Sequence, residues 1–170
     1  MDEKITISAL VRNRAGVLLR VAGLFARRGY NIGSLTVCET ENPDFSRMTV
    51  VSHGEEAQLR QLEKQLLKLE DVVKVLHLQE GKLIASELLL IKVHCTNRDR
   101  PAVLQTVTAC GARVKDIGHS TLTAELTGES ALIDRFIREM SRHGIAELSR
   151  SGLTALEIGD VTISQESCEP

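Results

Sequence analysis

The residues best placed for chemistry lie in the stretch VRNRAGVLLRVAGLFARRGYNIGSLT, residues 11–36. An alternating apolar pattern ends at Val11, a loop bearing Gly16 follows, and a helical apolar pattern begins at Val17. The first turn of a helix leaves backbone N–H groups without intrahelical partners, and the helix dipole adds partial positive charge there. Glycine lets a small anion approach such a turn closely. The stretch could therefore hold a carboxylate, although an ordinary strand–helix connection gives the same pattern more often.

Side chains suited to catalysis are scattered along the chain. The sequence contains no GxSxG, no glycine-rich dinucleotide fingerprint and no P-loop. His94 and Cys95 are neighbours on a predicted strand, so their side chains point to opposite faces and do not suit one metal ion. The carboxylate pairs at 55–56 and 70–71 fall at helix boundaries, where capping and solvation explain them. We therefore expect no catalytic residue and no metal site.

The composition excludes several classes of protein. Hydrophobic residues make up 42% and charged residues 26% of the 170 residues, which is typical of a globular protein. The net charge of −2 and the four aromatic side chains are a poor basis for binding nucleic acid. The four cysteines form no CxxC pair, so we interpret them as reduced thiols, mostly in the core. No segment reaches the ~20 apolar residues that span a bilayer, and MDEKITIS resembles no targeting peptide, so we expect a cytoplasmic protein.

The first half of the chain predicts the element order β-α-β-β-α-β. Strands are expected at about 4–11, 31–40, 45–52 and 72–78, and helices at about 17–28 and 55–69. The short connection around Pro43 favours a hairpin between the second and third strands. A leucine stripe in the second helix is too short for a coiled coil and fits packing on a sheet; its members are Leu59, Leu62, Leu66 and Leu69. This order is that of the split βαβ, or ferredoxin-like, arrangement.

The second half repeats the pattern with an offset of roughly 85 residues. Strands are expected at about 87–95, 112–117, 120–126 and 145–158, with helices at about 101–109 and 129–142. The predicted fold class is therefore α+β, with two ferredoxin-like βαββαβ domains in tandem. We expect the first domain at 1–80, a linker at 81–86, the second domain at 87–160 and a disordered tail at 161–170.

The repeat differs at the loop that could bind an anion. NRAGVL in the first half corresponds to NRDRPAVL in the second. Where the first half offers Gly16, the second has an extra charged residue and Pro101, which has no N–H to donate. If one half binds an anion at this loop, it is the first.

Several separated blocks point to a family. VRNRAGVLLRVAGLFARRGYNIGSLTV, SRMTVV at 46–51, EKQLLKLEDVVKV at 63–75, SELLLIKV at 86–93 and AELSRSGLTALEIGD at 146–160 occur in this order. Together they closely resemble the small, regulatory subunit of acetolactate synthase, also called acetohydroxyacid synthase. The resemblance covers nearly the whole chain and is densest in the first 80 residues.

The resemblance implies a first domain of the ACT type, which binds a small effector and dimerises. It also implies a subunit that has no catalytic activity and no cofactor of its own and that acts in branched-chain amino acid biosynthesis. The expected partner is the catalytic subunit, which would hold thiamine diphosphate, Mg²⁺ and FAD. The small subunit would raise the activity of that partner and make it sensitive to feedback inhibition by valine.

By the same resemblance, valine would bind between two ACT domains of a homodimer. The implied positions are Asn13, Gly16 and Val17 on the loop and helix start, and Asn31 and Ile32 on the next strand, which is expected at a sheet edge. Backbone N–H groups at the helix start suit a carboxylate, and asparagine amides suit an ammonium beside it. Without the resemblance, Asn13 and Asn31 are ordinary entry residues of a helix and a strand.

Some questions stay open in the sequence. Arg14, Ala15 and Leu19 depart from the usual family pattern beside the site, which affects effector affinity and the preference among valine, leucine and isoleucine. Arg47 and Arg150 are candidate contacts to the catalytic subunit, but structural charges fit them equally well. The alternative function is a stand-alone tandem ACT regulator that senses an amino acid and controls another protein.

Overall fold

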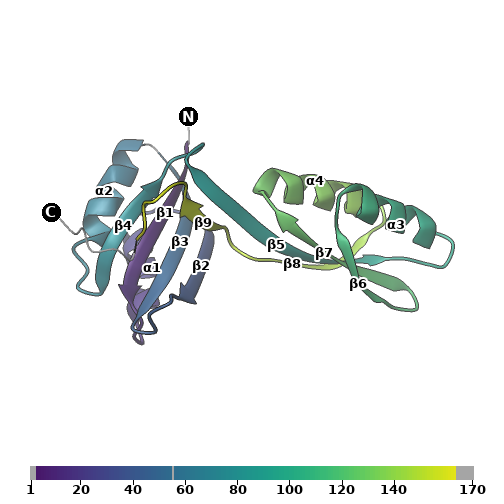
Figure 1. The fold of residues 1–170 in the computed structure, drawn as a ribbon, viewed down its shortest axis with the longest axis horizontal. Coiled ribbons are helices and arrows are strands. Elements are labelled where there is room, and N and C mark those ends of the chain that lie inside the picture. Colours follow the sequence, from purple (N-terminus) through teal and green to yellow (C-terminus); the bar gives the residue numbers. More distant parts are fainter. Residues whose placement is uncertain (1–2, 55, 164–170) are drawn as a thin grey trace. The chain divides into compact units, whose positions relative to one another are not determined.

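The computed structural model describes residues 3–54 and 56–163, which cluster into two compact units. The first unit contains residues 3–84 and 153–163, and the second contains residues 85–152. The elements of the first unit, in chain order, are β1 (Glu3–Arg12), α1 (Val17–Arg27), β2 (Ile32–Glu39), β3 (Phe45–Gly54), α2 (Glu56–Leu66) and β4 (Val72–Leu78). The order β-α-β-β-α-β predicted for the first half is confirmed (Figure 1).

The first sheet is antiparallel, with the strand order β2-β3-β1-β4. The hairpin around Pro43 joins β2 and β3, and β2 lies at the edge of the sheet, as expected. This order places β1 at the centre, beside β3 and β4. The loop after β1 therefore leaves the middle of the sheet.

One face of this sheet carries the main core of the unit. Alternate residues of β1, such as Ile7 and Val11, pack with Phe25 of α1 and with Leu62 and Leu66 of α2. Phe25 and Val11 are fully buried. The leucine stripe of α2 therefore packs on the sheet, and the placement of the Leu59 side chain lies outside the described part of the chain.

The second unit has the same topology. Its elements are β5 (Leu83–His94), α3 (Arg100–Ala109), β6 (Arg113–Ile117), β7 (Thr121–Gly128), α4 (Ser130–Ser141) and β8 (Ile145–Arg150). The strand order β6-β7-β5-β8 repeats that of the first sheet. Its core includes Ile91, Leu122 and Phe136. The α+β class with two ferredoxin-like units is thus confirmed.

A last strand, β9 (Thr154–Glu157), pairs with β5 and clusters with the first unit. We call residues 153–163 the C-terminal strap. The Leu153 N–H donates to Ser34 Oγ of β2, and Lys74 Nζ of β4 donates to the Thr162 carbonyl. The strap thus crosses the first sheet on the face away from α1, as Figure 1 also shows. It buries Leu153, Ala155 and Ile163.

The structure differs from the expected domain boundaries. The proposed linker at 81–86 is a turn at Gly81 followed by the start of β5, which runs on from Leu83 into the second unit. Residues 153–160 cluster with the first unit instead of the second. The expected tail at 161–170 includes the buried Ile163, and residues 164–170 lie outside the described part of the chain. A local sequence pattern identifies a strand, but long-range pairing decides which unit it joins.

Two further expectations concern membranes and thiols. Within the described residues no helix is long and apolar enough to cross a membrane. Cys95 is buried as a core thiol, but Cys38 is exposed on the edge strand β2. Cys168 lies outside the described residues.

Candidate functional site

Gly16 forms the turn that begins α1. It is the N-cap residue, with φ of 86° in the left-handed region, and no side chain caps the helix. Non-glycine residues rarely adopt this conformation, so the turn explains the glycine. The Val17 N–H makes only a long contact of 3.4 Å with the Arg14 carbonyl, and the Val17 side chain is buried in the core. Gly16 and Val17 can therefore offer a ligand their backbone and little else.

The Asn13 side chain fastens this loop to the β2–β3 hairpin. Its Nδ2 donates to Glu39 Oε1 at 3.0 Å and to the Pro43 carbonyl at 2.9 Å. The Asn13 backbone N–H also donates to the Asp44 carbonyl at 2.8 Å. Both amide hydrogens are thus engaged, so the side chain can present its Oδ1 acceptor to a ligand ammonium.

Arg20 is a neighbour of Gly16 that the sequence analysis missed. Its Nη1 lies 3.4 Å from the position that a Cβ on Gly16 would occupy. Its Nη2 is paired with Asp71 Oδ2. Residues four apart on a helix lie one turn from each other, so the spacing from Gly16 to Arg20 was the available signal. A guanidinium beside the helix start strengthens the attraction for a carboxylate.

Asn31 and Ile32 follow the C-terminal end of α1. The helix ends at Gly29, which has a φ of 69°. The Gly29 N–H donates to the Ala26 carbonyl and the Tyr30 N–H donates to the Phe25 carbonyl, which is a Schellman motif. The Asn31 side chain is exposed, and the Asn31 backbone carbonyl accepts a hydrogen bond from Ser52 Oγ. Ile32 is half-buried against the core.

The structure separates the expected site residues into two groups. Asn13, Gly16 and Val17 lie at the end of the sheet where Asn13 contacts Glu39. Asn31 and Ile32 lie at the other end of β2. Seven positions separate Ile32 from Glu39, which at about 3.3 Å per residue is roughly 23 Å. One chain therefore does not bring the two groups together around a molecule as small as an amino acid.

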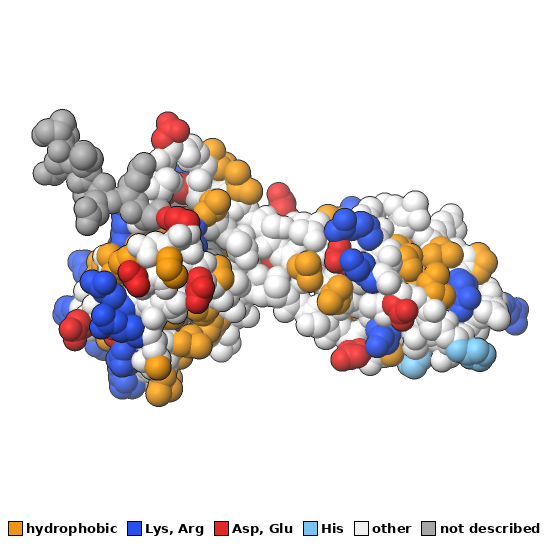
Figure 2. Space-filling model, turned by 60° about the horizontal axis from the view of Figure 1, so that its bottom comes forward, with side chains coloured by type: hydrophobic (Ala, Val, Ile, Leu, Met, Phe, Trp, Pro, Cys, Tyr) orange, Lys and Arg blue, Asp and Glu red, His pale blue; other side chains and the backbone are white. Residues whose placement is uncertain are grey.

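Basic side chains surround the first group. Arg12 and Arg14 of the loop are exposed beside it, whereas Arg27 and Arg28 lie at the opposite end of α1, from which the chain leads to Asn31. Figure 2 shows Lys and Arg side chains gathered over part of the first unit. Arg14 thus adds a positive charge next to the helix start.

Arg47 on β3 has partners within its own unit. Its Nε donates to Ser8 Oγ at 3.0 Å on the face that the strap covers. Burial lowers the pKa of Arg47, while the Cys38 thiol and the Glu41 carboxylate act in the opposite direction. These contacts favour a structural role for Arg47 over a contact with another subunit.

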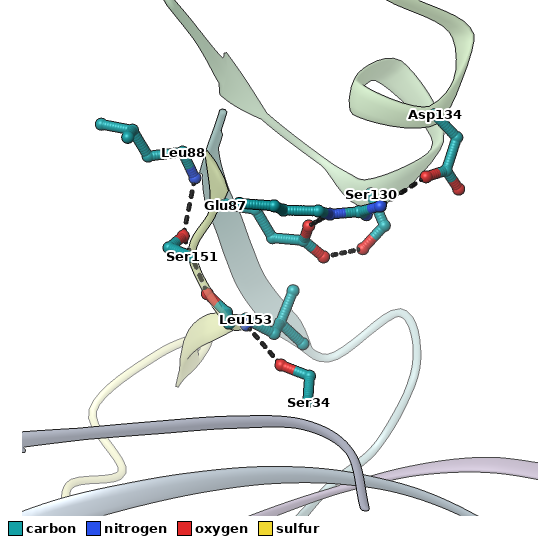
Figure 3. A network of polar contacts seen from close by, with 9 residues as sticks. Ser34, Glu87, Leu88, Ser130, Asp134, Ser151 and Leu153 are labelled. Atoms are coloured by element: carbon teal, nitrogen blue, oxygen red, sulfur yellow. Dashed lines mark hydrogen bonds and ion pairs between the residues drawn. The ribbon is translucent and has the colours of Figure 1, made fainter. Parts of the chain in front are cut away.

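Arg150 also has a structural role, in the second unit. Its Nε pairs with the buried Glu87 carboxylate, and its Nη1 donates to Asp134 Oδ1 at 2.7 Å. Ser130 Oγ donates to the other oxygen of Glu87, as Figure 3 shows. Hydrogen bonding to Glu87 raises the pKa of Arg150, and Asp134 adds to this effect against the opposing effect of burial. The network ties β5 and β8 to α4.

The corresponding loop of the second unit lacks the anion-binding features of the first. Asp99 is the N-cap of α3, and Pro101 occupies the first turn. Arg100 Nη2 donates a hydrogen bond to the Gly118 carbonyl. The sequence difference at Pro101 therefore corresponds to a different helix start, and only the first unit has an open glycine turn at this point.

No group of three or more His, Cys, Asp or Glu side chains within the described ranges could hold a metal ion. His94 is exposed while Cys95 is buried, in agreement with the alternation expected for adjacent strand residues.

Comparison with known proteins identifies both halves. Residues 7–74 match the family model described as the AHAS small subunit-like ACT domain, and residues 86–159 match the model described as the small subunit of acetolactate synthase.

Curated relatives match over almost the whole chain. The chain is 43% identical over 158 residues to a probable acetolactate synthase small subunit from Methanothermobacter thermautotrophicus, covering 92% of this chain and 94% of that protein. It is 40% identical to the acetolactate synthase isozyme 3 small subunit from Escherichia coli, covering 91% of this chain and 95% of the relative.

A solved structure agrees with both the sequence matches and the fold. The small subunit of acetolactate synthase from Thermotoga maritima matches with a TM-score of 0.87 and 34% identity, covering 94% of this chain and 99% of that one. These matches, together with the two βαββαβ units, show that the chain belongs to the family of acetolactate synthase small subunits.

Proposed function

We propose that this protein is the non-catalytic regulatory subunit of acetolactate synthase. It binds the catalytic subunit, raises its activity and makes it sensitive to inhibition by valine. Thiamine diphosphate, Mg²⁺ and FAD belong to the catalytic partner. The names of the relatives support the pairing with a catalytic subunit.

We further propose that valine binds between the ACT domains of two copies. The observation that carries this is the separation of Asn13 and Gly16 from Asn31 and Ile32 at opposite ends of the edge strand β2. If β2 pairs antiparallel with β2 of a second copy about a twofold axis near Leu35 and Thr36, Ile32 of one copy lies opposite Glu39 of the other. Since Asn13 contacts Glu39, each loop then faces the strand start of the other copy.

The chemistry of the two groups complements a zwitterion with a branched side chain. The helix start at Gly16, with Arg20 beside it, attracts the carboxylate. Asn13 Oδ1 of the same copy and the Asn31 amide of the other accept hydrogen bonds from the ammonium. Ile32 contributes apolar surface for the isopropyl group.

Gly16→Asp tests the carboxylate site. An Asp side chain at this position points at the Arg20 guanidinium and competes with the effector carboxylate for it. The variant subunit should still raise the activity of the catalytic subunit of acetolactate synthase, but valine should no longer inhibit the holoenzyme. The measurement is the valine inhibition curve of the holoenzyme reconstituted from both subunits.

Gly16→Asn is the matched control. Asparagine has the shape of aspartate and tolerates the left-handed region, but it carries no charge. It should retain valine inhibition with weakened affinity. Full valine inhibition in Gly16→Asp, equal to that of the unaltered protein, would exclude the helix start as the carboxylate site.

A further inference from the structure

Ser34 lies next to the expected effector residue Ile32, across a β-bulge. Ile32 pairs with Ser52 and Ser34 pairs with Val51, so Gly33 is an extra residue in β2. A bulge lets the strand change its local twist, so the position of Ser34 depends on how Ile32 is held. An added Cβ on Gly33 would lie 3.3 Å from the His53 ring, which leaves little room for any other residue there.

The Ser34 hydroxyl holds the beginning of the C-terminal strap. Its Oγ accepts a hydrogen bond of 2.9 Å from the N–H of Leu153, which is buried (Figure 3). A buried N–H without an acceptor is unfavourable, so this contact fixes where the strap begins. Both residues belong to the first unit.

The strap lies on a mixed apolar and polar surface. The outer face of the sheet carries the small buried hydroxyl residues Thr6, Ser8 and Thr49 together with the buried apolar residues Leu10, Val51 and Leu78. The buried apolar residues of the strap are Leu153, Ala155 and Ile163, whereas Leu156, Ile158 and Val161 are about half exposed. A segment that leaves half of its apolar side chains in solvent opens more readily than the core of the unit.

The strap is continuous with the Arg150 network of the second unit. Ser151, two residues before Leu153, binds Leu88 twice: its N–H donates to the Leu88 carbonyl, and its Oγ accepts from the Leu88 N–H. Glu87 and Arg150, the residues before these two, form an ion pair in which the Glu87 carboxylate is buried. Leu153, which binds Ser34 of β2, thus follows closely in the chain on the residues of this network.

We propose that Ser34 is a positioning residue for regulation, because its hydroxyl links occupation of the effector site to the docking of the C-terminal strap. This proposal rests on the proposed function of Asn31 and Ile32. Effector contact fixes the start of β2 and the bulge at Gly33, which aligns Ser34 with the Leu153 N–H. The strap is then held more firmly, and the change reaches the chain that enters the second unit.

Hydrogen exchange of the full-length protein, with and without saturating valine, tests the link. In the unaltered protein, valine should slow exchange of the amides from Leu153 to Ile158. In Ser34→Ala, exchange of these amides should be about fivefold to tenfold faster, as expected for the loss of one hydrogen bond, and valine should no longer slow it.

Two variants separate this role from a merely structural one. Ser34→Thr keeps a hydroxyl and should restore the effect of valine on the strap. Ser149→Ala removes an exposed serine hydroxyl from β8 and should behave like the unaltered protein.

Calorimetric titration of valine into the same samples distinguishes the two ways of failing. If valine binds but exchange of residues 153–158 does not change, the role of Ser34 is overturned while the effector site stands. If valine does not bind at all, the effector assignment fails, and the role of Ser34 fails with it.

Discussion

Gly16 shows how one backbone conformation can shape the proposed effector site. Its left-handed φ turns the chain into α1 without a side-chain cap, so the first turn stays open to a ligand. Arg20 then places a guanidinium above that turn, and Asp71 holds the guanidinium by an ion pair. The proposed site would thus offer an effector carboxylate backbone donors and a positive charge that are both in place before it binds.

Arg150→Met should destabilise the second unit. The change leaves the buried Glu87 carboxylate with Ser130 as its remaining side-chain partner. The loss of a hydrogen-bonded ionic partner should lower the free energy of unfolding by about 1.5–3 kcal/mol. Urea denaturation followed by circular dichroism measures the change.

The double variant Glu87→Gln/Arg150→Met is the control for that prediction, since it removes both charges. It should recover part of the lost stability, because no unpaired buried charge is left. An Arg150→Met protein as stable as the original would show that the network has no structural role, and Arg150 would return as a candidate contact for the catalytic subunit.

Only some of the residues of the proposed site and their contacts could be predicted from the sequence. The loop and its glycine follow from local rules, because the turn into a helix is a local event. The contacts of Asn13 with Glu39 and of Arg20 with Asp71 join residues 26 and 51 positions apart. No periodicity or spacing in the sequence indicates such contacts, so they required the structure.

At the scale of the elements, the edge strand β2 connects the two halves of the proposed site. One side of β2 pairs with β3, and the other is the edge of the sheet. Ile32 stands at one end and Glu39 at the other. Pairing with a second β2 would satisfy its outward backbone groups and complete two equivalent sites at once.

Val37→Lys should weaken the dimer. Val37 is 40% exposed on β2, so the unit should still fold with lysine there, but an ammonium in the pairing region would be costly to bury. We expect self-association weaker by at least about tenfold, measured by sedimentation equilibrium.

Leu156→Lys provides the matched control, because Leu156 is 53% exposed on the strap and not on the edge strand. It should self-associate like the unaltered protein. Unchanged association in Val37→Lys would argue against pairing through β2.

Most elements could be predicted from their periodicity, including the end of α1 at Gly29 and the proline in the first turn of α3. Residues 153–163 are the exception. Leu153 and Ala155 alternate with exposed residues as in any strand, but their burial comes from the outer face of the first sheet. Membership of a unit is a long-range property, and local patterns do not determine it.

At the scale of the whole molecule, one topology occurs twice with different contents. Both units have the same strand order and end their first helix with a glycine of positive φ, Gly29 and Gly111. They differ where ligands would bind, since the first helix of the first unit begins at Gly16 and that of the second at Asp99 and Pro101. This division fits a subunit in which the first unit senses the effector.

The central claim is that valine is held by two copies of the chain, with Asn13 and Gly16 from one and Asn31 and Ile32 from the other. Mixed dimers of Gly16→Asp and Asn31→Ala test it directly. Each variant alone lacks a complete site, because every site of its homodimer contains the altered residue. In a mixed dimer, one of the two sites combines an unaltered loop with an unaltered strand.

The measurement is calorimetric titration of valine into each variant and into an equimolar mixture that has been allowed to exchange subunits. We expect no binding by either variant alone, and about a quarter of the original number of sites, at the original affinity, in the mixture. If the mixture binds no more valine than the separate variants, the two groups do not form one site between copies, and the account is contradicted.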